Sequence, residues 1–172
     1  KALEEVQNIR YAPRGKWLAC ASRDNYIYVL DPRKNYQIHA VCRGHSSFVN
    51  HVDWSLDGGL MQSVDGCYEV LLWDAHKFVQ DPQSFDRRDR AWATWTAVLG
   101  WPVQGVWKKF SDGTDVNSAH CCNKKKYLVT GDDYFKINLY RYPCLKGAKH
   151  KEYTGHCSHV MNVRFLRNDS RV

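Results

Sequence analysis

Apolar and polar residues alternate along short stretches of the chain, and these stretches recur with a common phase. Aligning the chain on itself brings VQNIRY, VNHVDW, VNSAHC and VMNVRF into one block. One column of that block holds a valine in every repeat: Val6, Val49, Val116 and Val160, at spacings of 43, 67 and 44 residues. Alternation of this kind, bounded by Gly, Pro and Asp, is typical of β-strands. The pattern therefore predicts a repeated all-β unit.

Two further apolar segments follow in register within each of the first three repeats. WLACAS, LMQSVD and YLVTGD come first, and YIYVLD, EVLLWD and KINLYR come next. The last group is apolar on both faces, with the columns Val29, Leu72, Leu139 and Leu30, Trp73, Tyr140. A strand that is apolar on both faces is buried on both sides. This favours the middle of a propeller blade, which lies between two neighbouring blades.

The repeat length predicts an arc of a β-propeller. Spacings of 43 and 44 residues match one WD-type blade of about 40–45 residues. We expect blades at about 6–48, 49–115 and 116–159, and the first strand of a fourth blade at 160–172. The second blade carries insertions at 75–90 and 101–115, with AWATWTAVLG between them as its fourth strand. Three blades and one strand cannot close a ring of about four to eight blades, so further blades are expected elsewhere.

Composition gives only limited information about the binding partner and the cellular compartment. The 172 residues carry a formal charge of +7, which favours acidic partners such as nucleic acid, anionic membranes or acidic proteins. Seven cysteines, an odd number without a Cys-x-x-Cys pair, fit free thiols in a reducing cytosol better than a disulfide framework. No signal peptide or long apolar run occurs. The chain begins with Lys1, which is expected if it is part of a longer protein.

Short dipeptides resemble those of WD-repeat propellers: Gly44-His45, Gly155-His156 and Trp73-Asp74. In that family a His, a Ser or Thr, an Asp and a Trp form a hydrogen-bonded tetrad. The resemblance gives such structural roles to His45, Ser63, Asp65, Trp73, Asp74 and His156. The tetrad's Asp position holds Cys67, and Asp65 comes two residues early. We therefore expect no blade in this chain to have the complete set.

Longer segments resemble the echinoderm microtubule-associated protein-like family over nearly the whole chain: GHSSFVNHVDWSLDG, WATWTAVLG, SDGTDVNSAHC, LVTGDDYFKINLYRYPC and GHCSHVMNV. The likeness falls near the end of that family's second, atypical propeller. It implies a non-enzymatic scaffold that binds tubulin, microtubules or other microtubule-bound proteins. The implied location is the cytoplasmic microtubule cytoskeleton, including the ciliary axoneme. Neither a membrane partner nor a cofactor is implied.

The candidate partner-binding residues lie in the two insertions and in one turn. They are Arg87, Arg88, Arg90, Trp101, Trp107, Lys108, Lys109, Lys124, Lys125 and Lys126. Together they are expected to form a composite basic and aromatic surface complementary to acidic tubulin. The alternative for each basic cluster is a solvated loop. The alternative for the two tryptophans is a small core that anchors the second insertion to its blade.

Other chemistries have weaker support. The clusters His120-Cys121-Cys122 and His156-Cys157 lack the paired spacing of a zinc site, so we expect no metal. We expect no catalytic residue either, because Cys121 falls in a core column and Asp132-Asp133 in a turn. The remaining alternative is a generic WD-repeat scaffold for another acidic protein or for nucleic acid or chromatin. Nucleic acid ranks below tubulin, because acidic residues alternate with the basic ones.

Overall fold

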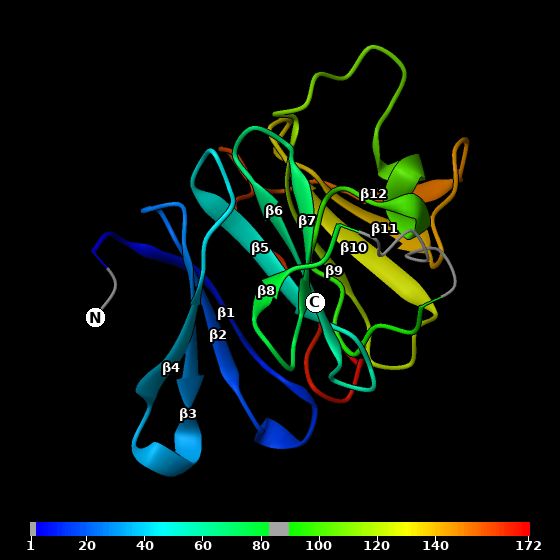
Figure 1. The fold of residues 1–172 in the computed structure, drawn as a ribbon. Helices are drawn as coiled ribbons and strands as arrows, with labels where there is room; N and C mark the ends of the chain where they lie inside the picture. The colour runs from blue at the N-terminus through cyan, green and yellow to red at the C-terminus, as the bar shows by residue number, and fades with distance from the viewer. Residues whose placement is uncertain (1–2, 83–89) are drawn as a thin grey trace. The chain divides into compact units, whose positions relative to one another are not determined.

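The computed structural model describes residues 3–82 and 90–172, which form two compact units, 1–94 and 95–172. Each unit consists of β-strands, turns and short 3₁₀ helices (Figure 1). Within the described residues the strands form three antiparallel four-stranded sheets. In each sheet the strands pair in the order in which they follow one another along the chain, as predicted for propeller blades. No helix in the described part of the chain is long and apolar enough to cross a bilayer.

The first unit holds two of these sheets. The first sheet comprises β1 (Val6–Tyr11), β2 (Leu18–Ser22), β3 (Ile27–Asp31) and β4 (Gln37–Cys42), with η1 (Pro13–Gly15) and η2 (Pro32–Lys34) in its turns. The second sheet comprises β5 (Val49–Trp54), β6 (Leu60–Asp65), β7 (Val70–Asp74) and β8 (Val79–Gln80). Asp31 shows how the local sequence turns the chain, because its side chain accepts a hydrogen bond from Arg33 N at the start of η2.

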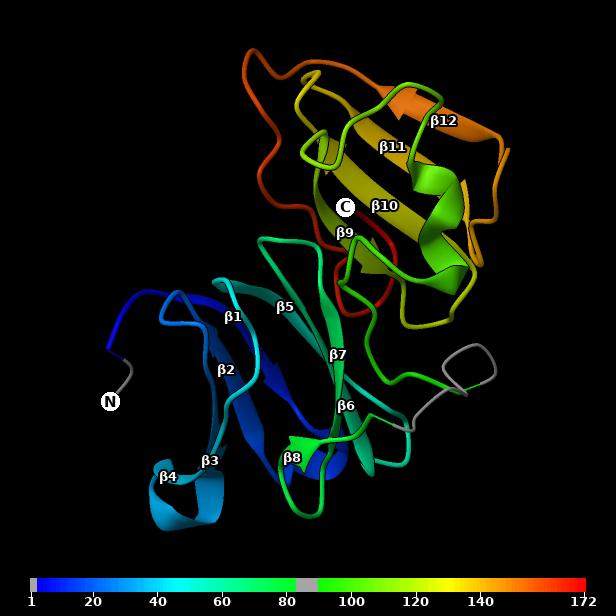
Figure 2. The ribbon, with the colours of Figure 1, turned by 45° about the horizontal axis from the view of Figure 1, so that its top comes forward.

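The core of the first unit lies between its two sheets. Strand β5 contacts β1 and β2, and the two ribbon views show these strands side by side (Figures 1 and 2). Trp54 at the end of β5 is fully buried, and its indole N–H donates to Arg10 O at 3.1 Å. Val29 and Trp73 belong to the same buried cluster. The columns of apolar residues in the sequence therefore mark the surfaces through which these two blades pack.

The fourth strand of the second sheet is not the predicted one. It is β8, which lies inside the segment predicted as an insertion. Asp74 Oδ1 accepts hydrogen bonds from the backbone N–H groups of His76 and Lys77, and this tight turn returns the chain at once to the free edge of β7. The predicted strand 91–100 instead begins beside β5, where Trp92 bridges to Ser55.

The second unit contains the third sheet, formed by β9 (Val116–Cys121), β10 (Tyr127–Asp132), β11 (Ile137–Arg141) and β12 (His150–Tyr153). The 3₁₀ helix η3 (Trp101–Val106) precedes it. Backbone hydrogen bonds from Gly105 N to Cys144 O and from Cys144 N to Pro102 O connect η3 to the loop after β11. The second insertion, predicted as part of the second blade, is thus held by the third sheet.

The segment 160–172 was predicted to start a fourth blade. Val160 N donates to Asp132 O at 3.0 Å, and Phe165 N donates to His120 Nδ1 at 3.1 Å. Val160 and Val163 pack against Val129. No strand forms over 160–172 in the described chain, because its backbone makes only isolated hydrogen bonds there and not the continuous ladder that a strand requires.

Candidate functional site

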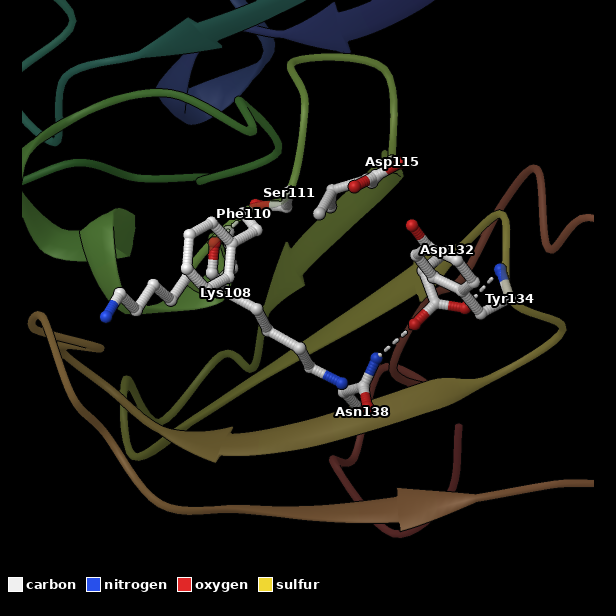
Figure 3. A pocket seen from close by; sticks show the side chains of 10 residues that line it. Lys108, Phe110, Ser111, Asp115, Asp132, Tyr134 and Asn138 are labelled. Atoms are coloured by element: carbon white, nitrogen blue, oxygen red, sulfur yellow. Dashed lines mark hydrogen bonds between the residues drawn. The ribbon is translucent and has the colours of Figure 1, made fainter.

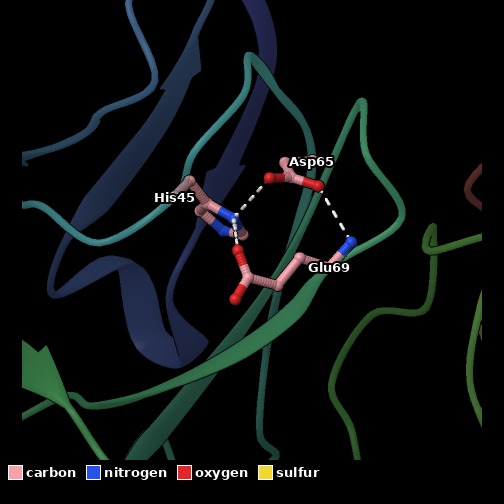
Figure 4. A group of neighbouring side chains, drawn as sticks. All are labelled: His45, Asp65 and Glu69. Atoms are coloured by element: carbon pink, nitrogen blue, oxygen red, sulfur yellow. Dashed lines mark hydrogen bonds and ion pairs between the residues drawn. The ribbon is translucent and has the colours of Figure 1, made fainter.

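Four buried side chains connect the loop before β5 with β6 and β7. The Trp73 indole N–H donates to Ser63 Oγ at 2.7 Å, and Ser63 Oγ lies 2.6 Å from His45 Nε2. On the other side of the imidazole, His45 Nδ1 lies 3.3 Å from Asp65 Oδ2 (Figure 4). We call His45, Ser63, Asp65 and Trp73 the His45 network. Burial lowers the pKa of His45, although Asp65 and Glu69 act in the opposite direction, so the ring favours its neutral form.

The expectation that no blade has the full set of four was wrong. Asp65, and not Cys67, lies beside the imidazole, and Cys67 is exposed. Asp65 Oδ1 accepts hydrogen bonds from the backbone N–H groups of Cys67 and Glu69, so the same carboxylate also shapes the turn between β6 and β7. The signal that sequence reasoning missed is the shared column of Asp65 and Asp132, which perform the same task in two repeats.

The two remaining WD-type residues act differently. Asp74 caps the turn before β8, and the backbone donors from His76 and Lys77 hold its pKa below the ordinary value. His156 is exposed in the loop after β12. No strand follows β12 in the described residues, so the partners that His45 finds on β6 and β7 have no counterpart for His156 there.

The second insertion is anchored by its tryptophan and by a close backbone approach. The Trp107 indole N–H donates to Val98 O at 3.0 Å, and both Trp101 and Trp107 are half-buried. Val103 and Val106 of η3 are buried. A Cβ at Gly105 would collide with the carbonyl oxygen of Leu145, so only glycine fits this contact. These contacts favour the anchoring interpretation of the two tryptophans.

The two lysines after Trp107 have different environments. Lys108 Nζ lies 2.9 Å from Glu152 Oε1, and Lys136 Nζ lies 2.8 Å from the other oxygen. Hydrogen bonds from Lys136, Lys108 and His150 lower the pKa of Glu152 to about 2. Among the described residues Lys109 has no carboxylate partner; its ammonium lies 5.0 Å from the ring centre of Phe110. Phe110 is 93% exposed, so this pair is available for contact with another molecule.

A hollow of about 170 Å³ lies beside these two lysines (Figure 3). Its polar lining includes Asp115, Asp132 and Asn138. Asp132 is already occupied, since it accepts hydrogen bonds from Tyr134 N, Lys136 N and the Asn138 side-chain amide. The negative charge of Asp115 is the main reason that the pKa of Tyr134 is raised. The hollow thus combines both signs of charge with the exposed Phe110 at its rim.

The remaining basic candidates lie elsewhere. Lys124, Lys125 and Lys126 form the turn between β9 and β10, where Asp169 Oδ2 accepts from Lys124 N at 2.9 Å. This turn and the turn that contains Tyr134 are at opposite ends of β10, so the structure does not gather all the lysines of this unit into one patch. In the first unit, Arg90 pairs with Asp57 at 3.1 Å. Arg87 and Arg88 lie outside the described residues.

Five of the seven thiols are buried, which makes them poor nucleophiles. Burial raises the pKa of Cys42 to about 12 and that of Cys144 to about 11, which disfavours the reactive thiolate. Cys121 and Cys122 are buried as well. One group in the described chain has the spacing of metal ligands, formed by His45, Asp65 and Glu69, whose ligand atoms lie within 4.8 Å of one another. Sequence reasoning had not singled out Glu69.

Comparison with known proteins agrees with this architecture. The family described as "Echinoderm microtubule-associated protein second beta-propeller" matches residues 1–172. The 77 kDa echinoderm microtubule-associated proteins of Lytechinus variegatus and Strongylocentrotus purpuratus are 45% and 48% identical to 98% of this chain, and the match covers 26% and 25% of their lengths. The human echinoderm microtubule-associated protein-like 3 is 43% identical over 98% of this chain and 19% of its own length.

The chain therefore spans about a quarter or less of these relatives. The three four-stranded sheets and the family match together confirm the predicted fold class, an arc of a β-propeller. The resemblance noted in the sequence is also confirmed. The chain belongs to the echinoderm microtubule-associated protein family, as a part of that family's second β-propeller.

Proposed function

We propose that this chain is a non-catalytic scaffold segment that binds tubulin or the microtubule lattice. The support from relatives is the name "microtubule-associated protein" that they carry. The support from chemistry is that five of the seven thiols are buried and that Asp132 accepts hydrogen bonds within a turn. The proposed location is accordingly the microtubule cytoskeleton of the cytoplasm, with the axoneme as a specific case.

The observation that carries the proposal is the exposed pair Lys109 and Phe110. A cation that has no carboxylate partner in the described part of the chain, next to an exposed aromatic ring, combines charge complementarity with apolar contact area. Both features recur in the residues that dominate interfaces. Tubulin surfaces are acidic, so the lysine attracts them and orients the encounter. The anchored insertion holds this pair in place before binding, which reduces the ordering that binding requires.

Lys124, Lys125 and Lys126 are proposed as a second contact at the other end of the same sheet. Their turn is held by Asp169, which accepts hydrogen bonds from the backbone of Asn123 and Lys124. The lysine side chains are left to face solvent at Lys124 and Lys126, which are exposed. Arg87, Arg88 and Arg90 of the first insertion remain candidates on the same electrostatic argument.

Co-sedimentation with polymerised microtubules, and size exclusion with soluble tubulin, test the proposal directly. The variant Lys109→Glu/Phe110→Ala is expected to bind at least tenfold more weakly than the unchanged protein. Lys34→Glu, which makes the same charge change in η2 of the first unit, is the matched control and should bind normally. Binding should also weaken as salt rises, since exposed charges are screened.

Competing double-stranded DNA separates the alternative scaffold function from the proposed one. An excess of DNA should leave microtubule binding intact. Release of the protein from microtubules by DNA, or equal binding by Lys109→Glu/Phe110→Ala and the unchanged protein, would contradict the proposal. A loss confined to Lys124→Glu/Lys126→Glu would move the contact to the turn between β9 and β10 and overturn the assignment to Lys109 and Phe110.

A further inference from the structure

The hollow on the third sheet lies at the position where the second sheet holds a histidine. Asp132, which lines the hollow, occupies the column of Asp65. Asn138, which also lines it, occupies the column of Leu71. In the second sheet the loop before β5 covers this position, because His45 Nδ1 lies 3.3 Å from Asp65 Oδ2. The corresponding position of the third sheet instead borders a hollow of about 170 Å³.

The third repeat has no histidine in the column of His45. That column holds Asp112, whose carboxylate accepts hydrogen bonds from the backbone N–H and the hydroxyl of Thr114. This carboxylate therefore shapes its own turn and does not replace the imidazole. A single water requires about 10–15 Å³ of such space, so the hollow has room for a side chain.

A buried oxygen in the lining of the hollow lacks a hydrogen-bond donor. Asn138 is 2% exposed, and its side-chain nitrogen donates to Asp132 Oδ2 at 2.8 Å (Figure 3). A carboxylate only accepts, so this bond fixes which end of the amide is the nitrogen. Asn138 Oδ1 then remains without a partner in the described part of the chain. Because an unpaired buried acceptor costs free energy, a group in the hollow that carries an N–H would be stabilised there.

The charges around the hollow favour a neutral occupant. The titratable groups that line it carry both signs and are Lys108, Lys109, Asp115, Asp132 and Tyr134. A cationic or an anionic side chain would therefore meet a like charge. A neutral imidazole offers one donor and one acceptor nitrogen. The donor suits Asn138 Oδ1, and the acceptor suits the ammonium of Lys109, which has no carboxylate partner among the described residues.

An aromatic ring at the rim also suits an imidazole. Phe110 is 93% exposed, and its φ of 72° is a conformation that bulky side chains rarely adopt. Flat rings pair favourably when they are offset or tilted. The second sheet contains such a pair, since the ring centres of His45 and Trp73 lie 6.0 Å apart at an interplanar angle of 52°. Phe110 is available to make the corresponding contact in the third sheet.

We propose that the hollow binds the neutral imidazole of a histidine that a partner protein presents. The imidazole would take the place on the third sheet that His45 takes on the second. The inference goes beyond the proposed function, because it does not depend on whether the partner is tubulin. Protonation should release the histidine, since imidazolium has no acceptor nitrogen and is repelled by Lys108 and Lys109.

Titration of the full chain with N-acetyl-histidine methylamide, followed by amide chemical shifts in NMR, tests the site. The shifts should cluster at the residues that line the hollow. Because the pKa of a free histidine side chain is about 6.5, the affinity should be about tenfold lower at about pH 5.5 than at about pH 8. The corresponding phenylalanine and lysine derivatives serve as matched probes and should bind much more weakly at either pH.

Two variants assign the binding to the proposed groups. Asn138→Leu removes the acceptor and should weaken binding of the histidine probe at least fivefold, whereas Asn117→Leu, outside the hollow, should not. Lys109→Met lies in an exposed loop, so the fold should persist, and it should weaken binding severalfold; Lys34→Met in η2 is its control. Circular dichroism checks the fold of each variant.

Shifts outside the hollow, equal affinity at the two pH values, or tighter binding of the lysine probe would overturn the proposal. Unchanged affinity in both Asn138→Leu and Lys109→Met would do the same. A protein that pellets with microtubules but does not bind the histidine probe would refute this site and leave the proposed function standing.

Discussion

The second and third sheets solve the same structural problem with different side chains. In both, an aspartate that ends the second strand accepts backbone N–H groups from the following turn: Asp65 from Cys67 and Glu69, and Asp132 from Tyr134 and Lys136. The second oxygen of the carboxylate makes the difference. Asp65 Oδ2 faces His45 from the preceding loop, whereas Asp132 Oδ2 accepts from Asn138 on the neighbouring strand at 2.8 Å.

This difference gives the segments that precede the two sheets different structural roles. The second sheet needs the loop before β5 to complete the surroundings of its aspartate. In the third sheet Asn138 on β11 donates to the aspartate, so the segment before β9 is not needed for this contact. That segment is the insertion that presents Lys109 and Phe110. The third sheet thus keeps the geometry of its turn without a contribution from the segment that we propose as the tubulin contact.

The largest expected effect comes from removing the buried indole of Trp73 at one end of the His45 network. Trp73→Ala should lower the free energy of unfolding by about 3–5 kcal/mol, because it leaves a cavity among buried side chains. Urea unfolding followed by circular dichroism measures this change. Trp107→Phe in the second insertion, which loses one indole N–H but keeps an aromatic ring, serves as the comparison and should cost far less. Equal losses for the two variants would show that the His45 network does not stabilise its blade.

The difference between the two sheets can be tested more directly at Asn138, which contacts Asp132 in the third sheet as His45 contacts Asp65 in the second. Asn138→Leu keeps the number and branching of the side-chain heavy atoms but removes the amide that donates to Asp132 Oδ2. The buried carboxylate oxygen then lacks a partner, and the free energy of unfolding should fall by about 1–3 kcal/mol. Leu71 occupies the same column of the second sheet, so leucine itself is compatible with this strand position.

Urea unfolding of Asn138→Leu, with Asn117→Leu on β9 of the same sheet as the control, measures that loss. Asn117 donates to Asp133, which is less buried, so the control should be affected less. A stability of Asn138→Leu equal to that of the unchanged protein would mean that solvent satisfies Asp132. The conclusion that the third sheet satisfies Asp132 through its own Asn138 would then be refuted.

A smaller effect is expected at Ser63, where two hydrogen bonds of the His45 network meet. Ser63→Ala removes the acceptor of the Trp73 indole and the contact with His45 Nε2. The loss should be about 1–3 kcal/mol, since two buried groups lose a partner while little volume changes. Ser63→Thr, which keeps the hydroxyl, should recover part of it. Failure of threonine to restore any stability would point to packing, and not to hydrogen bonding, at this position.

The sequence predicts those features whose residues recur in the same column of several repeats. The first three strands of every sheet repeat in columns, so a common phase was enough to find them. Strand β8 has two exposed residues and no alternating pattern, and the turn made by Asp74 places it earlier than expected. The role of Asp65 was available from its column with Asp132. Glu69 carried no signal, because its distance from His45 depends on the course of the turn.

The separation of the lysine clusters could not be predicted from the sequence. Lys108 and Lys124 are close in the sequence, but a strand runs between them and carries their loops to different ends of the sheet. Basic composition predicts an acidic partner without saying which loops share a surface. Exposure of Phe110 was equally hidden, because a phenylalanine in an insertion is compatible with a buried anchor as well as with a free ring.

The smallest expected effect concerns the ion cluster that connects the second insertion to β12. Hydrogen bonds from Lys136, Lys108 and His150 lower the pKa of Glu152 to about 2, below the ordinary glutamate value of about 4.3. A group whose pKa is lower in the folded state stabilises the fold above its unfolded pKa, and this stabilisation is lost as the pH falls toward the folded value. Unlike β12, β8 consists of the uncharged Val79 and Gln80, so the second sheet has no equivalent charge on that strand.

Glu152→Gln should therefore destabilise the protein by well under about 1 kcal/mol at neutral pH, because the cluster is partly exposed and screened. The difference between the variant and the unchanged protein should stay constant above about pH 5 and shrink between about pH 4.5 and 2. Melting temperatures across this range, repeated at high salt, measure it; salt should reduce the difference at neutral pH. A difference that persists at pH 2 would show that Glu152 acts through packing, so the insertion would be held to β12 without its charge.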